Sequence, residues 1–150
     1  MRPTGASAGR VGENRRELVL GDAYRNILVA YDGSEGGRAA LRRAAELAAV
    51  RRSPLTVVQA TAEEEAARTR QSLEGAIGGL ESALEVRPWV VRVPAGEAII
   101  AVASDIEADL IVSGSRSRSR FAGSSTLGSV STELAHRAPC DVLLIPPYSD

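Results

Sequence analysis

The sequence predicts an α/β fold in which a parallel sheet carries helices on both faces. Short apolar runs of strand length alternate with longer stretches whose apolar residues recur at helical spacing, and this alternation repeats four times before a last strand. The length of 150 residues is that of about one domain, and 44% hydrophobic with 25% charged residues is ordinary for a globular protein. Ligands of such sheets bind at the carboxyl ends of the strands, where strand order reverses.

Residues 1–23 are expected to form a disordered N-terminal extension, and residues 24–147 the domain. Gly, Ser, Pro and Arg dominate the extension, and Leu18 to Leu20 are its one short apolar patch. The first strand is predicted at Asn26–Tyr31, an apolar run that Asp32, Gly33 and Ser34 end.

A helix is predicted next, at Glu35–Arg51, because alanines and Leu47 recur at helical spacing while arginines occupy another face. Pro54 precedes the second strand, predicted at Leu55–Ala60. Leucines and Ile77 then form the apolar stripe of a long helix, predicted at Glu63–Glu85. Three glycines weaken that helix, each by about 1 kcal/mol relative to alanine.

The third strand is predicted at Trp89–Val93 and runs into a Pro-Ala-Gly turn. Apolar residues at helical spacing predict a helix at Glu97–Glu107, and the fourth strand follows at Asp109–Ser113. The last helix passes through Val130, Leu134 and Ala138 and ends at a proline. The fifth strand is predicted at Asp141–Ile145, where two further prolines stop it.

Several functional classes lose support from what the sequence lacks. All 18 basic residues are arginine, so a Walker-type phosphate lysine and a Schiff-base lysine are absent. Cys140 is the single cysteine, and with His136 alone it makes no zinc site. No GxGxxG fingerprint follows the first strand, which weakens an NAD-type reading. A net charge of -1 favours neither nucleic acid nor an anionic membrane, and without a signal peptide a cytoplasmic location is expected.

The segment from Gly114 to Ser131 is the most informative stretch for function. It is rich in Gly, Ser and Arg, and it joins a predicted strand to a helix N-terminus. Free N–H groups and the helix dipole favour an anion there, and small residues let a phosphate approach the backbone. The alternative is an ordinary flexible connection with solvated arginines.

Four pieces of the chain, at matching separations, resemble the universal stress protein family. They are NILVAYDGSEGGRAALRRAAELA near the start, Gly96 to Ile99, ADLIVSGSRSRS, and LGSVSTELAHRAPCDVLLIP at the end, and together they cover residues 25–146. The resemblance implies a Rossmann-like, adenine nucleotide alpha hydrolase-like fold, an open five-stranded parallel sheet in the order 3-2-1-4-5 with two helices on each face.

Many members of that family bind ATP through a Gly-x-x-Gly pattern followed by a spaced Gly-Ser or Gly-Thr. Gly114 matches the first glycine, and Gly128 with Ser129 matches the end. Ser117 stands where the second glycine is expected, and Arg118 to Leu127 is one residue longer than the spacing of the pattern. The additional residue could bulge outward, or it could put the loop out of register.

The family pattern and the residues together suggest a nucleotide site at the ends of the strands. Asp32 would accept from a ribose hydroxyl or an adenine amino group, or cap the first helix or its turn, for which Ser34 is better placed. Backbone groups of Val58 and Ala60 would meet adenine. Gly128, Ser129, Val130 and Ser131 begin the last helix and would hold phosphates, or only cap it, and Arg116 would contact phosphates or stay solvated.

No catalytic constellation is evident, so a regulatory nucleotide binder is favoured over an enzyme, which at most would be a slow ATPase. The expected ligand is ATP or another adenine nucleotide such as AMP or cyclic AMP, with Mg²⁺ as its companion. A dimeric interaction module that binds no nucleotide is the alternative. We expect a homodimer through Val142, Leu143, Leu144 and Ile145, because the implied strand order leaves this apolar strand at an edge, unless Leu18 to Leu20 cover it.

Overall fold

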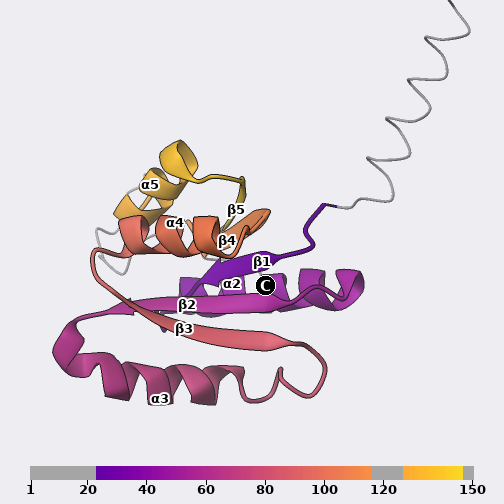
Figure 1. Cartoon of the computed structure of the whole chain (residues 1–150), viewed down its shortest axis with the longest axis horizontal. Coiled ribbons are helices and arrows are strands. Elements are labelled where there is room, and N and C mark those ends of the chain that lie inside the picture. Colours follow the sequence, from indigo (N-terminus) through magenta and orange to yellow (C-terminus); the bar gives the residue numbers. More distant parts are fainter. Residues whose placement is uncertain (1–22, 116–126, 147–150) are drawn as a thin grey trace, which may run out of the picture.

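The computed structural model describes residues 23–115 and 127–146, so expectations that concern residues 1–22, 116–126 and 147–150 lie outside it. Its centre is one five-stranded parallel sheet in the order β3-β2-β1-β4-β5, which confirms the expected fold (Figure 1). The elements in chain order are β1 (Ile27–Ala30), α2 (Glu35–Arg51), β2 (Leu55–Thr61), the 3-10 turn η1 (Glu63–Glu65), α3 (Ala66–Ile77), β3 (Val86–Arg92), α4 (Ala95–Asp105), β4 (Leu110–Gly114), α5 (Ser129–Arg137) and β5 (Asp141–Ile145).

Two hydrophobic cores lie on opposite faces of the sheet. Successive residues of a strand point to opposite faces, so Ile27 and Val29 of β1 pack with α2 and α3, while Leu28 packs with α4 and α5. All three of these side chains are fully buried. Burial on both faces explains why the central strands read as continuous apolar runs rather than as alternating patterns.

The predicted long helix at Glu63–Glu85 is wrong in extent. The chain forms the short turn η1 and then α3, which ends at Ile77 with Gly78 at its C-terminal boundary. Gly78 and Gly79 lose more backbone entropy in a helix than other residues do, and the segment beyond α3 contains turns rather than helix. Leu80 and Leu84 still pack against the core from this irregular segment.

The third strand begins at Val86, three residues before the predicted start at Trp89. The added residues include Pro88, which has no N–H group to donate to a neighbouring strand. The Val93 N–H bonds to the carbonyl of Thr61 in β2. Because backbone groups alternate in direction along a strand, the nitrogen of Pro88 then faces the open edge, where a missing donor costs nothing.

Cys140 lies half-buried beside the α4 and α5 core, as a small hydrophobic residue would. Burial raises the pKa of its thiol to about 11, and the carboxylates of Asp109 and Asp141 add to the shift. The thiol is therefore protonated at neutral pH. Within the described ranges, no helix has the length and apolarity needed to cross a bilayer.

Gly114 allows β4 to approach α2 closely. A Cβ atom at this position would lie 3.1 Å from the carbonyl carbon of Gly36 and 3.2 Å from its oxygen. Both are backbone atoms, so neither can move aside without shifting α2. The glycine that the sequence assigned to phosphate binding therefore has a packing role as well.

We predict that Gly114→Ala lowers the free energy of unfolding by about 1–3 kcal/mol, the usual cost of overpacking a rigid contact. Gly75→Ala is the matched control, because Gly75 lies in α3 and a Cβ there would meet no atom within 4 Å. It should raise stability by about 0.5–1 kcal/mol through helix propensity. Urea unfolding of both variants measures the difference, and equal stability of Gly114→Ala and the parent protein would contradict the packing role.

Candidate functional site

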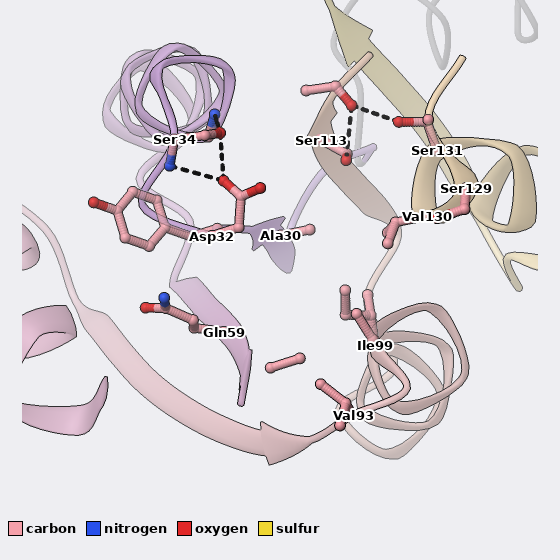
Figure 2. Close-up of a pocket in the computed structure, with 16 residues that line it drawn as sticks. Ala30, Asp32, Ser34, Gln59, Val93, Ile99, Ser113, Ser129, Val130 and Ser131 are labelled. Atoms are coloured by element: carbon pink, nitrogen blue, oxygen red, sulfur yellow. Dashed lines mark hydrogen bonds between the residues drawn. The ribbon is translucent and has the colours of Figure 1, made fainter. Parts of the chain in front are cut away.

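A crevice of about 460 Å³ opens at the carboxyl ends of the strands (Figure 2). Clefts of roughly 300–1,000 Å³ are typical of small-molecule sites. It lies beyond the end of β1, which has β2 on one side and β4 on the other. The chain continues from β1 to β2 and returns from β3 to β4, so strand order reverses here, and this is the switch point of the sheet. The lining residues are Ala30, Tyr31, Asp32, Ser34, Gly37, Gln59, Ala60, Val93, Ala95, Ile99, Ser113, Gly114, Gly128, Ser129, Val130 and Ser131.

The turn after β1 fixes the carboxylate of Asp32. Ser34 is the N-cap of α2, and its Oγ accepts a hydrogen bond from the Gly37 N–H at 3.0 Å. Oδ1 of Asp32 in turn accepts from the Ser34 N–H at 2.9 Å and from the Ser34 hydroxyl. The other carboxylate oxygen points away from Ser34, toward the side of the crevice where Ser113 lies (Figure 2). Asp32 therefore supports the turn with one oxygen and offers the other to a ligand.

Gly37 makes room for this carboxylate. A Cβ atom at Gly37 would lie 2.6 Å from Oδ1 of Asp32 and 3.1 Å from its backbone nitrogen. Gly37 was not among the predicted site residues, because its role depends on a contact between the Asp32 turn and the first turn of α2. The small residue at this place in a helix was the only available signal.

The carbonyl of Gly114 ties α5 to β4. It accepts hydrogen bonds from the hydroxyl of Ser131 at 2.6 Å and from the hydroxyl of Ser113 at 3.1 Å. Ser131 is 2% exposed, and its proton is engaged in this bond. Its hydroxyl therefore holds the helix in place and has no proton left to donate to a phosphate.

The N-terminus of α5 opens into the crevice. Its N-cap is Gly128, which supplies no side-chain cap, and the first turn contains no acidic residue. The first intrahelical bond runs from the Thr132 N–H to the Gly128 carbonyl, so the N–H groups of Ser129, Val130 and Ser131 precede the helical ladder. Such groups, together with the helix dipole, suit an anion.

Ala60 presents backbone groups to the crevice. The Tyr31 N–H bonds to the carbonyl of Val58, so both backbone groups of Val58 face β1. The same holds for Ala60, two residues later, but β1 has ended at Ala30 and the chain turns away after Tyr31. No other described residue pairs with the Ala60 N–H and carbonyl on that side. Val58 itself is fully buried beneath and does not line the crevice.

Most of the site residues expected from the sequence lie together in the crevice wall. They are Asp32, Ala60, Gly114, Gly128, Ser129, Val130 and Ser131. Val58 is not in the wall, and Arg116 and Ser117 lie outside the described residues. Asp32 is the one charged side chain among the described lining residues. Among residues 23–115 and 127–146, no three His, Cys, Asp or Glu side chains gather as a metal site would require.

Gln59 also lines the crevice and was not among the predicted site residues. It lies at the end of β2, and its Oε1 is buried with no hydrogen-bond partner. Figure 2 shows its amide pointing away from Val93 and Ile99. Gln59 shares a face of β2 with Val57, which packs in the core under α2 and α3. A glutamine in a predicted strand gives no sequence signal of this kind, since only the folded chain shows which polar atoms lack partners.

The chain is similar to known proteins in both sequence and fold. The sequence model of the universal stress protein family matches residues 23–146. A universal stress protein of Mycolicibacterium smegmatis is 31% identical over 128 residues, which cover 81% of this chain and 98% of that protein.

Two solved structures are similar over nearly their whole lengths. A universal stress protein in complex with cAMP is 29% identical, with a TM-score of 0.72 and coverage of 84% of this chain and 99% of that one. The universal stress protein from Archaeoglobus fulgidus in complex with dAMP is 27% identical, with a TM-score of 0.64 and coverage of 82% and 98%. Both ligands of these relatives are adenine nucleotides.

We predict that Ser34→Ala lowers the free energy of unfolding by about 1 kcal/mol, because α2 loses its N-cap bond to Gly37. Ser104→Ala is the control, since Ser104 is exposed near the end of α4 and caps nothing. Thermal and urea unfolding of the two variants provide the comparison. If both variants unfold like the parent protein, the cap does not stabilise the turn that holds Asp32.

Proposed function

The chain belongs to the universal stress protein family, and from that premise we propose that it is a stress-related regulatory protein of the cytoplasm that binds an adenine nucleotide in the crevice between the Asp32 turn and the start of α5. The observation that carries the proposal is the pairing of two complementary features in one cavity. A helix N-terminus without a cap side chain suits phosphate, and unpaired backbone groups at Ala60 suit a base.

The base would occupy the apolar part of the crevice. Ala30, Val93, Ala95 and Ile99 supply aliphatic surface there. Val93 is 56% exposed, so a bound ring would remove apolar surface from water. The Ala60 N–H and carbonyl form a donor and acceptor pair, which matches the ring nitrogen and amino group on one edge of adenine.

The sugar and phosphates would lie between Asp32 and α5. The free oxygen of Asp32 is an acceptor for a ribose hydroxyl. Ser129 and the N–H groups at the start of α5 would meet the phosphate. Arg116 and Ser117 follow Gly114 in the sequence and would also belong to the nucleotide site. With a polyphosphate, Mg²⁺ would accompany the ligand, because this ion binds through phosphate oxygens and few protein carboxylates.

We also propose a homodimer through β5. This strand lies at the sheet edge, and Val142, Leu143 and Leu144 are only partly buried. A second copy that pairs with β5 would satisfy the open backbone groups and cover these side chains. The same edge supports the alternative function, a dimeric interaction module of this fold that binds no nucleotide.

Isothermal titration of the full chain with ATP, AMP and cyclic AMP at physiological salt tests the nucleotide proposal. We expect binding, and we expect Asp32→Asn to weaken it about five- to tenfold, because a neutral amide makes weaker bonds to hydroxyls than a carboxylate does. Asp105→Asn, at the exposed end of α4, is the matched control and should bind like the parent protein.

The nucleotide proposal fails if folded protein gives no heat with any of the three ligands at millimolar concentration. That outcome would leave the interaction module. Binding that Asp32→Asn does not change would instead remove Asp32 from the site while keeping the proposal of a nucleotide.

Light scattering at tens of micromolar protein tests the dimer. We expect a dimer for the full chain and for a chain that begins at Tyr24, because β5 provides the interface in both. Monomers in both cases would refute the β5 interface. A full chain that is monomeric and dimerises only after truncation would show that the extension, with Leu18 to Leu20, covers the edge.

A further inference from the structure

We propose that the hydroxyl oxygen of Ser113 accepts a hydrogen bond from one hydroxyl of the ribose, while Asp32 accepts a hydrogen bond from the other. The crevice would then need both ribose hydroxyls, and it would prefer ribonucleotides to deoxynucleotides and to 3′,5′-cyclic nucleotides. This inference rests on the proposed function and adds a residue that determines sugar specificity. Ser113 lines the crevice but was not among the predicted site residues.

The side chain of Ser113 lies on the same face of the sheet as the apolar wall of the crevice. Ser113 comes two residues after Ile111 in β4, and successive residues of a strand point to opposite faces. Ile111 packs in the core under α4 and α5, and Ile99 of the crevice wall belongs to that core. Ser113 is only 5% exposed, so a ligand in the crevice meets a hydroxyl that is almost removed from water.

The hydroxyl oxygen of Ser113 keeps its capacity to accept. Its hydrogen is donated to the Gly114 carbonyl at 3.1 Å, and no residue in the described part of the chain donates to the oxygen in return. A hydroxyl has one donor hydrogen and two acceptor lone pairs, so the acceptor positions of Ser113 remain open. A buried acceptor without a donor costs free energy, and a ligand that supplies the donor removes that cost.

The carboxylate of Asp32 determines what kind of group can meet Ser113. Its free oxygen points toward the side of the crevice where Ser113 lies (Figure 2). A phosphate beside this carboxylate would be repelled, whereas the N-terminus of α5 attracts it. The group that lies between Asp32 and Ser113 is therefore a neutral donor of two hydrogen bonds. The ribose supplies such a pair, because its two hydroxyls are on adjacent carbons.

Ligands that lack one of these hydroxyls would bind more weakly. A 2′-deoxynucleotide has no hydroxyl on one of the two carbons, and a 3′,5′-cyclic nucleotide uses the oxygen of the other carbon in its phosphate ester. Each of them leaves one acceptor of the crevice without a donor. A site built to bond a hydroxyl discriminates against the analogue that lacks it, because its own buried group then stays unpaired.

The first test needs no variant and compares AMP with 2′-deoxy-AMP and 3′-deoxy-AMP. All three are titrated into the full chain by isothermal titration. We expect each deoxy ligand to bind about fivefold or more weakly than AMP, which is the loss of one hydrogen bond. Equal affinity for AMP and for either deoxy ligand would overturn the inference, because one of the two acceptors would then have no partner.

The second test repeats these titrations with Ser113→Ala. We expect this variant to bind AMP about fivefold more weakly than the parent protein, and to bind one of the two deoxy ligands as well as it binds AMP. The Gly114 carbonyl keeps its bond from Ser131, so α5 stays tied to β4 in the variant. Ser53→Ala is the matched control and should bind all three ligands like the parent protein. Ser53 is also buried and donates to a backbone carbonyl, that of Tyr24, but it lies outside the crevice.

A Ser113→Ala variant that distinguishes AMP from both deoxy ligands as strongly as the parent protein does would overturn the inference. A loss of AMP affinity in that variant would then come from a contact other than a ribose hydroxyl. This result leaves the proposed nucleotide site intact. A folded parent protein that binds none of the three ligands removes the proposed function and the inference with it.

Discussion

The contact between Gly114 and Gly36 is the constraint on which the geometry of the crevice depends. It brings the end of β4 so close to the start of α2 that a Cβ at Gly114 would force the α2 backbone to shift. The Gly114 carbonyl also receives the hydroxyls of Ser113 and Ser131, which ties α5 to the same point. One short segment thus sets the positions of two helix N-termini, and the Asp32 turn and the start of α5 face one cavity as a result.

Charge is distributed unevenly in that cavity. Asp32 lies at one end and is held by the hydrogen bonds of Ser34, while the N-terminus of α5 lies across the crevice without an acidic residue in its first turn. A ligand that carries hydroxyl donors at one end and an anion at the other complements this arrangement. A nucleotide has that polarity, with its phosphate at one end of the ribose.

The two edge strands of the sheet differ in the side chains that flank their unpaired backbone groups. At one edge, β3 places Pro88 and charged arginines, and such residues discourage pairing with another strand. At the other edge, β5 carries four consecutive aliphatic residues. Val142, Leu143 and Leu144 are partly exposed, and only Ile145 is buried. The contrast makes β5 the edge that is suited to association.

The sequence by itself determined the alternation of strands and helices, since the apolar periodicity reflects burial on one or two faces. It also located seven of the sixteen residues of the crevice wall, because the ends of parallel strands meet at one edge of a sheet. It failed at Glu63–Glu85, where glycines end the helix early, and at the start of the third strand, which begins at Val86 and includes Pro88 at the sheet edge. Only the tertiary structure decided the packing role of Gly114, the bond that engages Ser131, and the unpaired oxygen of Gln59. Each of these depends on contacts between residues far apart in the chain, which local patterns do not encode.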